Sequence, residues 1–600
     1  MRLENGRMTQ SQIIVLATPV FFLLIAIEFA WGWAKKRNTY RLADAITSIS
    51  LGMLSQASAV FTRLLRVGIY TAVYTYVSLV PQETAQAFWN TWYGWILALV
   101  FYDFCYYWLH RLGHESAVLW AAHAVHHQSQ DYNLSTALRQ TSSGALLGWI
   151  FYVPMALAGV PPLLFGIVAL IDLLYQFWVH TEHVPKLGWF DRWFCSPSNH
   201  RVHHAVNDEY VDRNYGGVLV VWDRLFGSFK EEGATCVYGT RGLLGSWDPL
   251  WANTQVYWAL AKDSWHAQSW GDKLRVWIKP PGWRPADVAV RFPRPSFELA
   301  AVQRFHPDVS RAALWFGAVQ FMLLLGGVAV FLWFAEGLPV VQAAVWLAAL
   351  STGLWTTGAV LQGRLGIVEA LAMESAAVAT AAGALGLEEL HYVFKPLTMA
   401  LVIGIALLRA RAAGSIQRFD ALLMAGLAAS LAGDVLLMLK GMFIPGLVAF
   451  LIAHLFYIAL FRQGINWFPS RRALAATVAV GACMYAFLWS GLAPVLKVAV
   501  AAYVVVIALM AAQAIGRALV LRDSTSAAVA IGACFFMLSD ATLAINRFAM
   551  PLPMAQFWVL STYYIAQMLI ACNALPRASH AMARPSGTSS FSASSAPLPR

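Results

Sequence analysis

The stretch from residue 110 to residue 204 reads His110-Arg-Leu-Gly-His114, then His123-Ala-Val-His126-His127, then His180-Thr-Glu-His183, and finally His200-Arg-Val-His203-His204. It contains ten of the fifteen histidines of the chain. Side chains three or four residues apart lie on one face of a helix, with Cβ atoms about 5–6 Å apart. Because neutral imidazole is the commonest metal ligand in proteins, these spacings predict a histidine-rich metal centre carried by helices.

A solvated face, an apolar core or a haem site would fit the histidine motifs less well. A solvated basic face would contain lysine and arginine, and a buried core would contain leucine. Haem ligands usually come singly from the middle of different helices, whereas these motifs fall at the ends of predicted helices. Zinc sites seldom use more than four ligands, so eight or nine imidazoles suffice for two ions. Since imidazole binds iron, zinc, copper and nickel alike, the spacing predicts a binuclear centre and leaves the metal open.

The composition of the chain is that of a membrane protein. Apolar residues make up 59% of it and charged residues only 12%, about half the charged share of soluble domains, and the mean hydropathy is +0.57. Several apolar stretches reach the roughly 20 residues needed to cross a bilayer. We therefore predict an all-α, polytopic integral membrane protein. The formal charge of +11 indicates basic cytoplasmic loops, because no basic run interleaved with aromatics points to nucleic acid.

The N-terminal region, residues 1–90, is predicted to hold transmembrane segments. An apolar stretch at 13–33, followed by Lys35-Lys36-Arg37, is an uncleaved first span because it is too long for a signal peptide. Apolar segments follow at 43–62, 68–90 and 93–109. Basic residues flank 43–62 on both sides, so the number of spans before His110 stays open. The scattered cysteines exclude a disulfide framework or zinc ribbon.

A helical hairpin separates the second and third histidine motifs. Its predicted arms are 144–160 and 162–179, with Pro161-Pro162 between them. Two spans return the chain to the side it left, so the motifs at 110–127 and 180–204 are predicted to meet at one membrane face. Residues 91–235 form the predicted histidine core, and 236–311, rich in Trp and Pro, form an interfacial linker.

A second apolar block is predicted at 312–575, followed by a disordered Ser/Ala/Pro-rich tail at 576–600. It contains some eight to ten candidate spans, among them 314–334, 340–361, 392–409, 419–438, 443–462, 471–490, 495–515, 526–546 and 556–573. Two acids fall inside these spans, Asp434 in Leu431-Ala-Gly-Asp-Val-Leu-Leu437 and Asp540 in Phe535-Phe-Met-Leu-Ser-Asp540. Acids within spans are costly and are functional candidates, although interhelical hydrogen bonding in a scaffold would also explain them.

The histidine region resembles the fatty acid hydroxylase/sterol desaturase superfamily, and within it the alkylglycerol monooxygenases. The resemblance covers about 90–295 and rests on loops as well as histidines: Gln176-Phe-Trp-Val-His-Thr-Glu182, Ser196-Pro-Ser-Asn-His-Arg-Val-His-His204, Arg213-Asn-Tyr-Gly-Gly217 and Trp222-Asp-Arg-Leu-Phe-Gly227. It implies a membrane-bound non-haem centre of two iron ions that uses O2 to oxidise a lipid C–H bond. The iron ligands that it implies are His110, His114, His123, His126, His127, His180, His200, His203 and His204.

Three further residues of this region receive weaker expectations. His183 is not needed by the resemblance and is left out of the ligand set. Asp103 lies seven residues before His110, on the same helix face, where it could accept an imidazole N–H and fix the tautomer. Glu182 could do the same or contact a pterin. Both acids could equally be ordinary polar residues at a membrane edge.

The resemblance also implies a reaction. Hydroxylation beside the ether oxygen of an alkylglycerol gives a hemiacetal that collapses to a fatty aldehyde and a glycerol. The implied reductant is tetrahydrobiopterin, with an electron-donor protein as the alternative. The expected location is a bacterial inner membrane with the histidines on the cytoplasmic face.

The second block resembles the lysoplasmalogenase (YhhN-like) family over about 340–575. The shared features are Lys395-Pro396, the Gly-Asp at Asp434, the run from Ala449 to Tyr457, and Ser539-Asp540. The resemblance implies hydrolysis of a vinyl ether, for which Asp434 and Asp540 would serve as acid and base. Two alternatives to this overall interpretation stay open. One is a sterol, fatty acid or carotenoid hydroxylase with a structural second block, and the other is a metal-binding transporter.

Overall fold

The structure, a computed structural model, describes residues 9–574 of the chain. Within these residues the regular secondary structure is helical, and the β pairing consists of two isolated bridges, Phe194–Leu219 and Ala205–Tyr238. Eleven helices in the described part are long and apolar enough to cross a membrane. These findings confirm the all-α polytopic prediction. The tail predicted to be disordered, 576–600, lies outside the described residues.

The chain divides into two compact units at 367/368. The long helices of unit 1 are α1 (Gln10–Ala34), α2 (Leu42–Arg63), α5 (Trp92–Glu115), α10 (Pro162–Trp178), α16 (Arg311–Phe334) and α17 (Val340–Leu361). Its shorter helices are α3 (Ile69–Tyr76), α4 (Gln82–Trp89), α6 (Ala117–His127), α7 (Leu134–Ala137), α8 (Gly144–Gly148), α9 (Val153–Leu157), α11 (Pro197–His204), α12 (Val221–Leu225), α13 (Pro249–His266), α14 (Trp270–Ile278) and α15 (Ala286–Arg291).

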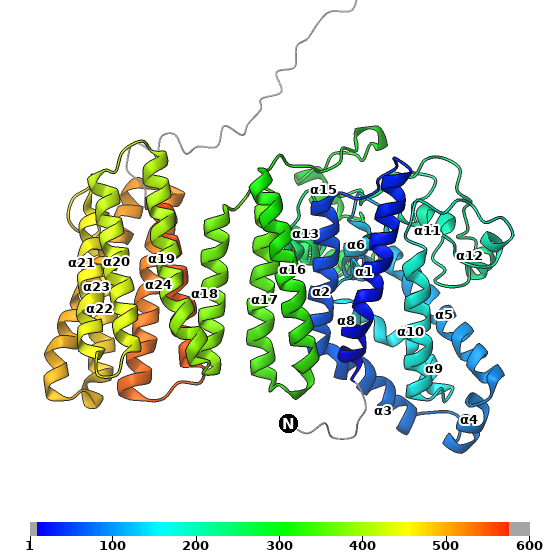
Figure 1. Cartoon of the computed structure of the whole chain (residues 1–600), viewed down its shortest axis with the longest axis horizontal. Coiled ribbons are helices and arrows are strands. Elements are labelled where there is room, and N and C mark those ends of the chain that lie inside the picture. The colour runs from blue at the N-terminus through cyan, green and yellow to red at the C-terminus, as the bar shows by residue number, and fades with distance from the viewer. Residues whose placement is uncertain (1–8, 575–600) are drawn as a thin grey trace, which may run out of the picture. The chain divides into compact units, whose positions relative to one another are not determined.

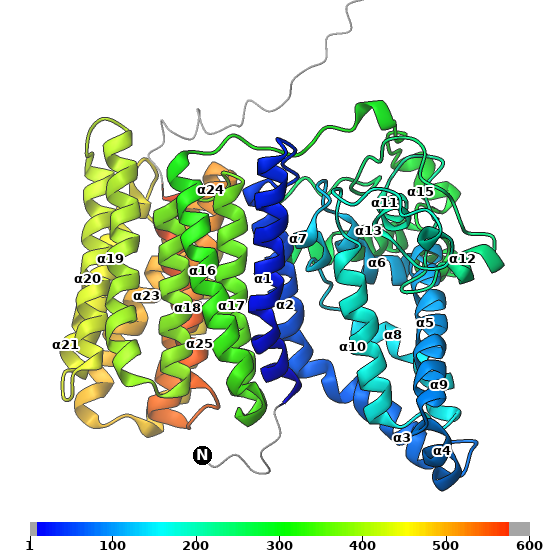
Figure 2. The ribbon, with the colours of Figure 1, turned by 45° about the vertical axis from the view of Figure 1, so that its right-hand side comes forward.

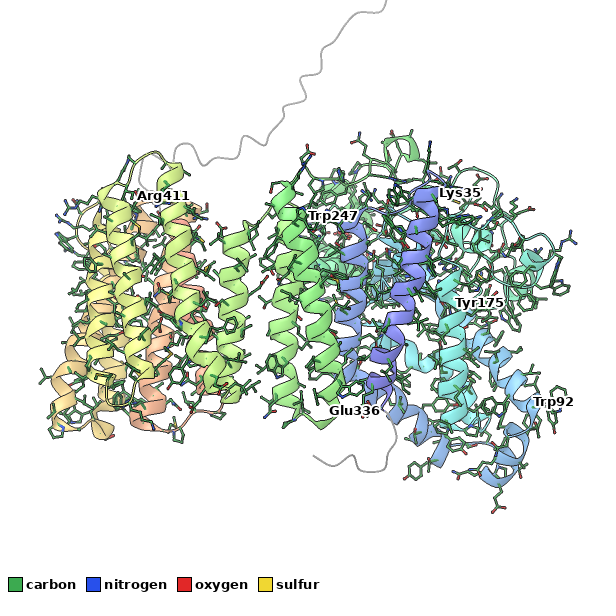
Figure 3. All side chains as sticks on the ribbon, viewed as in Figure 1. Lys35, Trp92, Tyr175, Trp247, Glu336 and Arg411 are labelled. Atoms are coloured by element: carbon green, nitrogen blue, oxygen red, sulfur yellow. The ribbon has the colours of Figure 1, made fainter. Side chains whose placement is uncertain are left out.

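The long helices of unit 1 lie side by side, and its short helices gather at their two ends. Helices α1, α2, α16 and α17 run side by side (Figure 1), and α2, α16 and α17 share an apolar core that includes Met53, Leu324 and Leu354. Helices α6, α11, α12, α13 and α15 gather toward one end of unit 1, and α3 and α4 lie toward the other (Figure 2). Lys35 and Trp247 lie at the end with α6 and α11, whereas Glu336 lies at the opposite end (Figure 3).

The chain before the first histidine motif differs from the prediction. The apolar segment 68–90 is two separate helices, α3 and α4, because Pro81 precedes α4 and cannot continue a helix from α3. Each has eight residues, too few to span. A π-helical turn at Leu64–Gly68 joins α2 to α3.

The hairpin predicted at 144–179 is present but shorter than expected. Its first arm is broken into α8, a 3-10 turn at Trp149–Tyr152 and α9, and its second arm is the 17-residue α10. The arms meet at Pro161, as predicted. The region 236–311 contains the 18-residue α13, which packs against α6. The predicted linker therefore supports the helix that carries three of the histidines.

Unit 2 is a bundle of eight helices in the described residues. They are α18 (Ile367–Leu385), α19 (Glu388–Ala412), α20 (Arg418–Met438), α21 (Phe443–Arg462), α22 (Arg471–Leu488), α23 (Pro494–Leu521), α24 (Ser524–Ala544) and α25 (Ala555–Asn573). A π-helical turn, η7 (Ile545–Ala549), extends α24. The core is a layer of Ala, Leu, Phe and Tyr side chains contributed mainly by α19, α20, α21, α23, α24 and α25.

The sequence predicted eight to ten spans in the second apolar block, and each of the nine with stated bounds corresponds to a helix of the structure. It missed α18, whose many alanines and two glutamates hold its mean hydropathy to 1.3. It also grouped 312–367 with the second block, whereas α16 and α17 pack against α2 in unit 1. Hydropathy reports that a helix is apolar and does not report its neighbours. The functional limits of the predicted modules stay predictions.

Candidate functional site

The nine predicted ligand histidines come together in unit 1 as two groups. The first group contains His110, His114, His123, His127 and His203, and the second contains His126, His180, His200 and His204. Within each group, the candidate ligand nitrogens all lie within 4.8 Å of one another. The prediction that the motifs on the two sides of the hairpin meet is confirmed, since His126 Nε2 lies 3.1 Å from His180 Nε2.

Helix ends position these side chains. His110 and His114 occupy the last turns of α5, and His123, His126 and His127 occupy the second half of α6. His180 follows the last residue of α10 by two positions, after the C-cap Val179. Helix α11 begins with a cap in which Ser196 accepts from the backbone N–H of Asn199, with Pro197 at its first position, a combination that favours helix initiation. All eight residues of α11 are buried, so its three histidines cannot turn to solvent.

The hydrogen bonds of the rings fix their tautomers. His110, His126, His180 and His203 each donate from Nδ1 to a backbone carbonyl, those of Tyr215, Arg139, Gln176 and Arg213, at 2.8–3.0 Å. The Nε2 atoms of these four neutral rings therefore carry lone pairs and no proton. Yet Nε2 of His126 faces Nε2 of His180 at 3.1 Å. Two bare lone pairs at this distance repel each other unless a cation lies between them.

The spacing of the ligand nitrogens fits metal ions. Six Nε2–Nε2 distances, three within each group, lie between 3.0 and 3.2 Å. For nitrogens bound at about 2.1 Å, a separation of about 3.0 Å corresponds to ligands at right angles around one ion. A regular tetrahedron would separate them by about 3.4 Å. The observed separations lie between these two values, so they fit imidazole nitrogens that share a metal ion.

The two groups lie next to each other. The rings of His127, in the first group, and His204, in the second, are stacked with centroids 4.3 Å apart and planes 22° from parallel. His200 and His203, one from each group, stack in the same way at 5.2 Å. Adjacent groups of five and four imidazoles agree with the predicted binuclear centre.

Burial keeps the rings in the form that binds metal. It lowers the pKa of His127, His203 and His204 well below the usual value, and neighbouring histidines lower it further. Burial likewise lowers the pKa of His126 to about 4. At neutral pH these imidazoles are uncharged, as metal ligation requires.

An arginine next to His200 ties the third and fourth motifs together. Arg201 on α11 donates from Nη1 to the carbonyls of Thr181 and Val184, at 3.0 and 2.8 Å. It also forms a two-pronged ion pair with Glu232, at 2.7 and 2.8 Å. The loop that carries His180 is thereby held against the helix that carries His200, His203 and His204.

The structure corrects the role predicted for Asp103. This residue was predicted to accept an imidazole N–H, but His110 donates to the carbonyl of Tyr215 instead. Asp103 accepts from the backbone N–H groups of Val218 and Leu219 and from the indole of Trp222. It fixes the loop whose residue Tyr215 orients His110, so it acts on the site through the backbone.

Glu182 and His183 lie outside both histidine groups. Glu182 is paired with Arg37 at 3.5 Å, beyond the end of α1. The backbone N–H of His183 donates to the Thr181 hydroxyl, and its ring lies against Gly32 of α1. A methyl group at Gly32 would come within 3.0 Å of His183 Nε2, so this glycine permits the close approach of α1. The omission of His183 from the ligand set agrees with this position.

Sequence reasoning missed Glu28, a buried acid of α1. Its carboxylate accepts hydrogen bonds from the Thr181 and Tyr40 hydroxyls and, at 2.8 Å, from the backbone N–H of Leu134. Thr181 follows His180, and Leu134 begins α7, between α6 and the hairpin. The sequence could have indicated Glu28, because it is a single acid within the apolar span α1, and such acids are functional candidates.

Unit 2 contains a separate polar site formed by its two acids. Asp434 on α20 is buried, accepts from the Tyr563 hydroxyl at 2.5 Å and lies 3.4 Å from the Lys395 ammonium. Asp540 on α24 accepts from the Tyr503 hydroxyl at 2.5 Å, and His454 lies 3.5 Å from it. Phe536 lies between the two sets, with its ring 5.5 Å from Tyr563 and 4.7 Å from His454.

Asp540 lines a cavity and Asp434 does not. The cavity has a volume of about 450 Å³ and lies among α20, α21, α22, α23, α24 and η7, within the usual range of about 300–1,000 Å³ for small-molecule sites. Its walls are apolar apart from a few side chains: Thr477, Tyr503, Cys534, Asp540 and Arg547. An apolar cavity with a carboxyl group in its wall suits a lipid chain with one reactive polar bond.

Comparisons with known proteins agree with both sites. The fatty acid hydroxylase family model matches residues 95–228, and the YhhN family model matches 390–574. The alkylglycerol monooxygenase of Homo sapiens is 36% identical over 311 residues, which cover 52% of this chain and 68% of that protein. The Xenopus tropicalis protein of the same name is 34% identical over 310 residues, with the same coverage of both chains. No solved structure was found to match the chain.

Fold and histidine site together define a membrane protein of the fatty acid hydroxylase class. Within this class, the chain belongs to the alkylglycerol monooxygenase family. Its C-terminal part is similar to Lysoplasmalogenase TMEM86A of Homo sapiens, which is 37% identical over 155 residues; these cover 25% of this chain and 63% of that protein. The resemblances inferred from the sequence are thus confirmed for both regions.

Proposed function

We propose that unit 1 is an iron-dependent monooxygenase that hydroxylates the carbon next to the ether oxygen of alkylglycerols. The observation that carries this proposal is the pair of histidine groups, whose unprotonated nitrogens face each other at distances that fit metal coordination. The proposed ligands are the nine histidines, and two iron ions are the proposed metal content. The similarity to alkylglycerol monooxygenases supports the ether-lipid substrate.

The reaction consumes O2, two electrons and two protons. One oxygen atom enters the C–H bond, the other leaves as water, and the hemiacetal that forms breaks into a fatty aldehyde and a glycerol. Bound iron supplies the activation of O2. The chain's own contribution is to hold the rings in one tautomer through the carbonyls of Tyr215, Arg139, Gln176 and Arg213, and to exclude water from buried imidazoles.

The electrons are proposed to come from tetrahydrobiopterin, with an electron-donor protein as the alternative. Glu182 is the proposed pterin contact. The side chain of Glu182 is 24% exposed and lies in the segment that follows His180, where a soluble reductant could reach it. This assignment is tested by measuring the affinity of the purified protein for the pterin in the wild type and in Glu182→Gln.

The proposed location is a bacterial inner membrane, with the histidine end of unit 1 on the cytoplasmic side. The run Lys35-Lys36-Arg37 directly follows α1 at that end of the unit. Lysine and arginine near the ends of spans favour the cytoplasmic side, which supports this orientation.

Metal analysis and turnover test the oxygenase proposal together. The purified full chain is expected to contain about two iron ions and to convert an alkylglycerol to a fatty aldehyde with uptake of O2. His123→Ala is expected to abolish turnover. One zinc ion and no O2 uptake would overturn the proposal. Oxidation of a sterol, fatty acid or carotenoid in place of the ether lipid would favour the alternative hydroxylase.

We propose further that unit 2 hydrolyses the vinyl ether of lysoplasmalogens. The observation that favours this second activity is Asp540 in the wall of an apolar cavity. Protonation of the outer vinyl carbon and addition of water to the carbon on oxygen give a hemiacetal, which releases a fatty aldehyde and an alcohol. Asp540 is the proposed proton donor, because it lines the cavity. Asp434, held by Lys395 and Tyr563, is proposed to position Tyr563.

Release of fatty aldehyde from a vinyl-ether lysophospholipid, without O2, tests this activity. The wild-type chain is expected to hydrolyse it after chelation of all metal. Hydrolysis that depends on metal or on O2 would contradict an acid-catalysed reaction in unit 2.

A further inference from the structure

The cavity of unit 2 has a cation at one end that the proposed chemistry does not use. Arg547 lies on η7, directly beyond α24, and its side chain is exposed and lines the cavity. Its guanidinium lies 3.8 Å from the centroid of the Phe443 ring, which lines the same cavity. In the described part of the chain, no carboxylate forms an ion pair with Arg547. The guanidinium of Arg547 lies over the face of the Phe443 ring, a cation–π contact that does not use its N–H donors.

The position of Arg547 is that of a lipid headgroup contact. It stands near the end of the candidate span Ser524–Ala549, at the depth where a membrane changes from hydrocarbon to polar headgroups. The turn that carries it is π-helical, a distortion that is often found at functional sites. Arginine matches phosphate oxygens with two parallel hydrogen bonds.

We propose that Arg547 binds the phosphate of a single-chain vinyl-ether phospholipid whose reactive bond lies at Asp540. This inference rests on the proposed hydrolysis in unit 2 and adds the residue that would select phosphate-bearing substrates over neutral alkenylglycerols. The hydrocarbon chain would lie among the apolar side chains of α22, α23 and α24, beyond Asp540.

Two lengths support this arrangement. Asp540 and Arg547 are seven residues apart on one continuous helical segment, about 10 Å along its axis. In the lipid, six covalent bonds join the vinyl carbon on oxygen to the phosphorus atom, as many as in two extended residues, or about 7 Å. The arginine side chain, leaning along the helix, covers the remainder. A diacyl lipid would need a second chain in the same cavity.

Binding to two lipids that differ only in the phosphate tests the proposal. The probes are a 1-O-alkyl lysophospholipid and the 1-O-alkylglycerol of the same chain length, neither of which has a vinyl bond to hydrolyse. For the full chain, Arg547→Gln is expected to weaken binding of the phosphate-bearing lipid to the unit 2 cavity by about 10- to 100-fold. Binding of the alkylglycerol should stay within about twofold. Any binding by unit 1 is the same in both chains and cancels.

Kinetics with the vinyl-ether substrates give a second readout. Arg547→Gln is expected to raise KM for the lysoplasmalogen by about 10- to 100-fold with little change in kcat, and Arg547→Lys should restore part of the loss. Arg472→Gln, an exposed arginine on α22 outside the cavity lining, is the matched control and should have no effect. Equal effects of Arg547→Gln on phosphate-bearing and neutral lipids in both assays would overturn the proposal.

Inorganic phosphate distinguishes the headgroup from a free anion. If phosphate alone inhibits the wild type as strongly on the neutral alkenylglycerol as on the lysoplasmalogen, Arg547 belongs to a free-anion site and the proposal fails. If the wild type hydrolyses neither vinyl ether, the proposed function of unit 2 fails, and the binding measurement still decides whether Arg547 recognises the phosphate.

Discussion

The two units bury polar groups in apolar surroundings and compensate them in opposite ways. In unit 1, two hydrogen-bond acceptors face each other: the unprotonated Nε2 atoms of His126 and His180 lie 3.1 Å apart. In unit 2, each acid faces a donor, Tyr563 and Lys395 for Asp434, and Tyr503 for Asp540. Because an uncompensated buried polar group is costly, the first site needs a cation from outside. In the second site, both acids accept hydrogen bonds from protein groups.

The largest expected difference between the units follows from metal removal. Chelation, or His203→Ala, is expected to abolish oxidation of alkylglycerols, because His203 lies in the first histidine group. Hydrolysis of lysoplasmalogens should continue unchanged, because both histidine groups lie in unit 1 and the two acids of unit 2 accept hydrogen bonds from protein donors. Aldehyde release from each lipid, before and after chelation and after iron is restored, measures both. Loss of both activities on chelation would break the comparison.

The converse change is Asp540→Asn. It is expected to slow vinyl-ether hydrolysis by about 10²- to 10⁴-fold, the usual contribution of a general acid. Iron content and alkylglycerol oxidation should be unaffected. The matched control is Glu389→Asn, since Glu389 is an exposed acid in the first turn of α19. Undiminished hydrolysis in Asp540→Asn would remove the carboxyl group from the proposed mechanism.

A smaller effect is expected from Glu28→Ala. Glu28 joins α1 to the residue after His180 and to the start of α7. Loss of outer contacts of this kind commonly costs about 10- to 100-fold in metal affinity or activity. Iron retained after dialysis measures the affinity, and Glu83→Ala, an exposed acid of α4, serves as control. Full iron retention with normal turnover would reduce Glu28 to a purely structural contact.

The smallest predicted effect concerns pH. Burial alone would raise the pKa of Glu232, but its hydrogen bonds with Arg201 and Ser198 outweigh burial and hold the pKa below the ordinary 4.5. A carboxyl whose pKa is lower in the folded state stabilises the fold above its unfolded pKa. That contribution is lost as the pH falls below about 4.5 and through the folded value. Glu232→Gln should remove about 1–2 kcal/mol of stability at neutral pH.

Thermal unfolding in detergent between neutral pH and about pH 3 measures this effect. The difference in Tm between wild type and Glu232→Gln is expected to shrink as the pH falls. Glu231→Gln is the matched control, because Glu231 is exposed and pairs with the exposed Lys186. A Tm difference that does not vary with pH would mean that the ionised pair is not what holds α11 to the His180 loop.

The sequence predicted the parts of unit 1 that depend on local spacing. Two histidines four residues apart must share a helix face, so the membership of His110/His114 and His123/His127 in one group could be anticipated. The assignment of His203 to that group, and of His126 to the other, could not, because it depends on how α11 packs against α6. The hydrogen-bond partner of His110 could not be predicted either, because Tyr215 lies 105 residues further along the chain.

Apolar composition determined by itself that this chain is a helical membrane protein, because only helices satisfy their own backbone groups in lipid. Histidine spacing predicted a metal centre, and the acids Asp434 and Asp540 indicated a second candidate site. Only the tertiary structure decided which helices belong to which unit, which nitrogens face each other, and that Asp540 lines a cavity while Asp434 does not. These depend on contacts between segments far apart in the chain, and neither hydropathy nor spacing records such contacts.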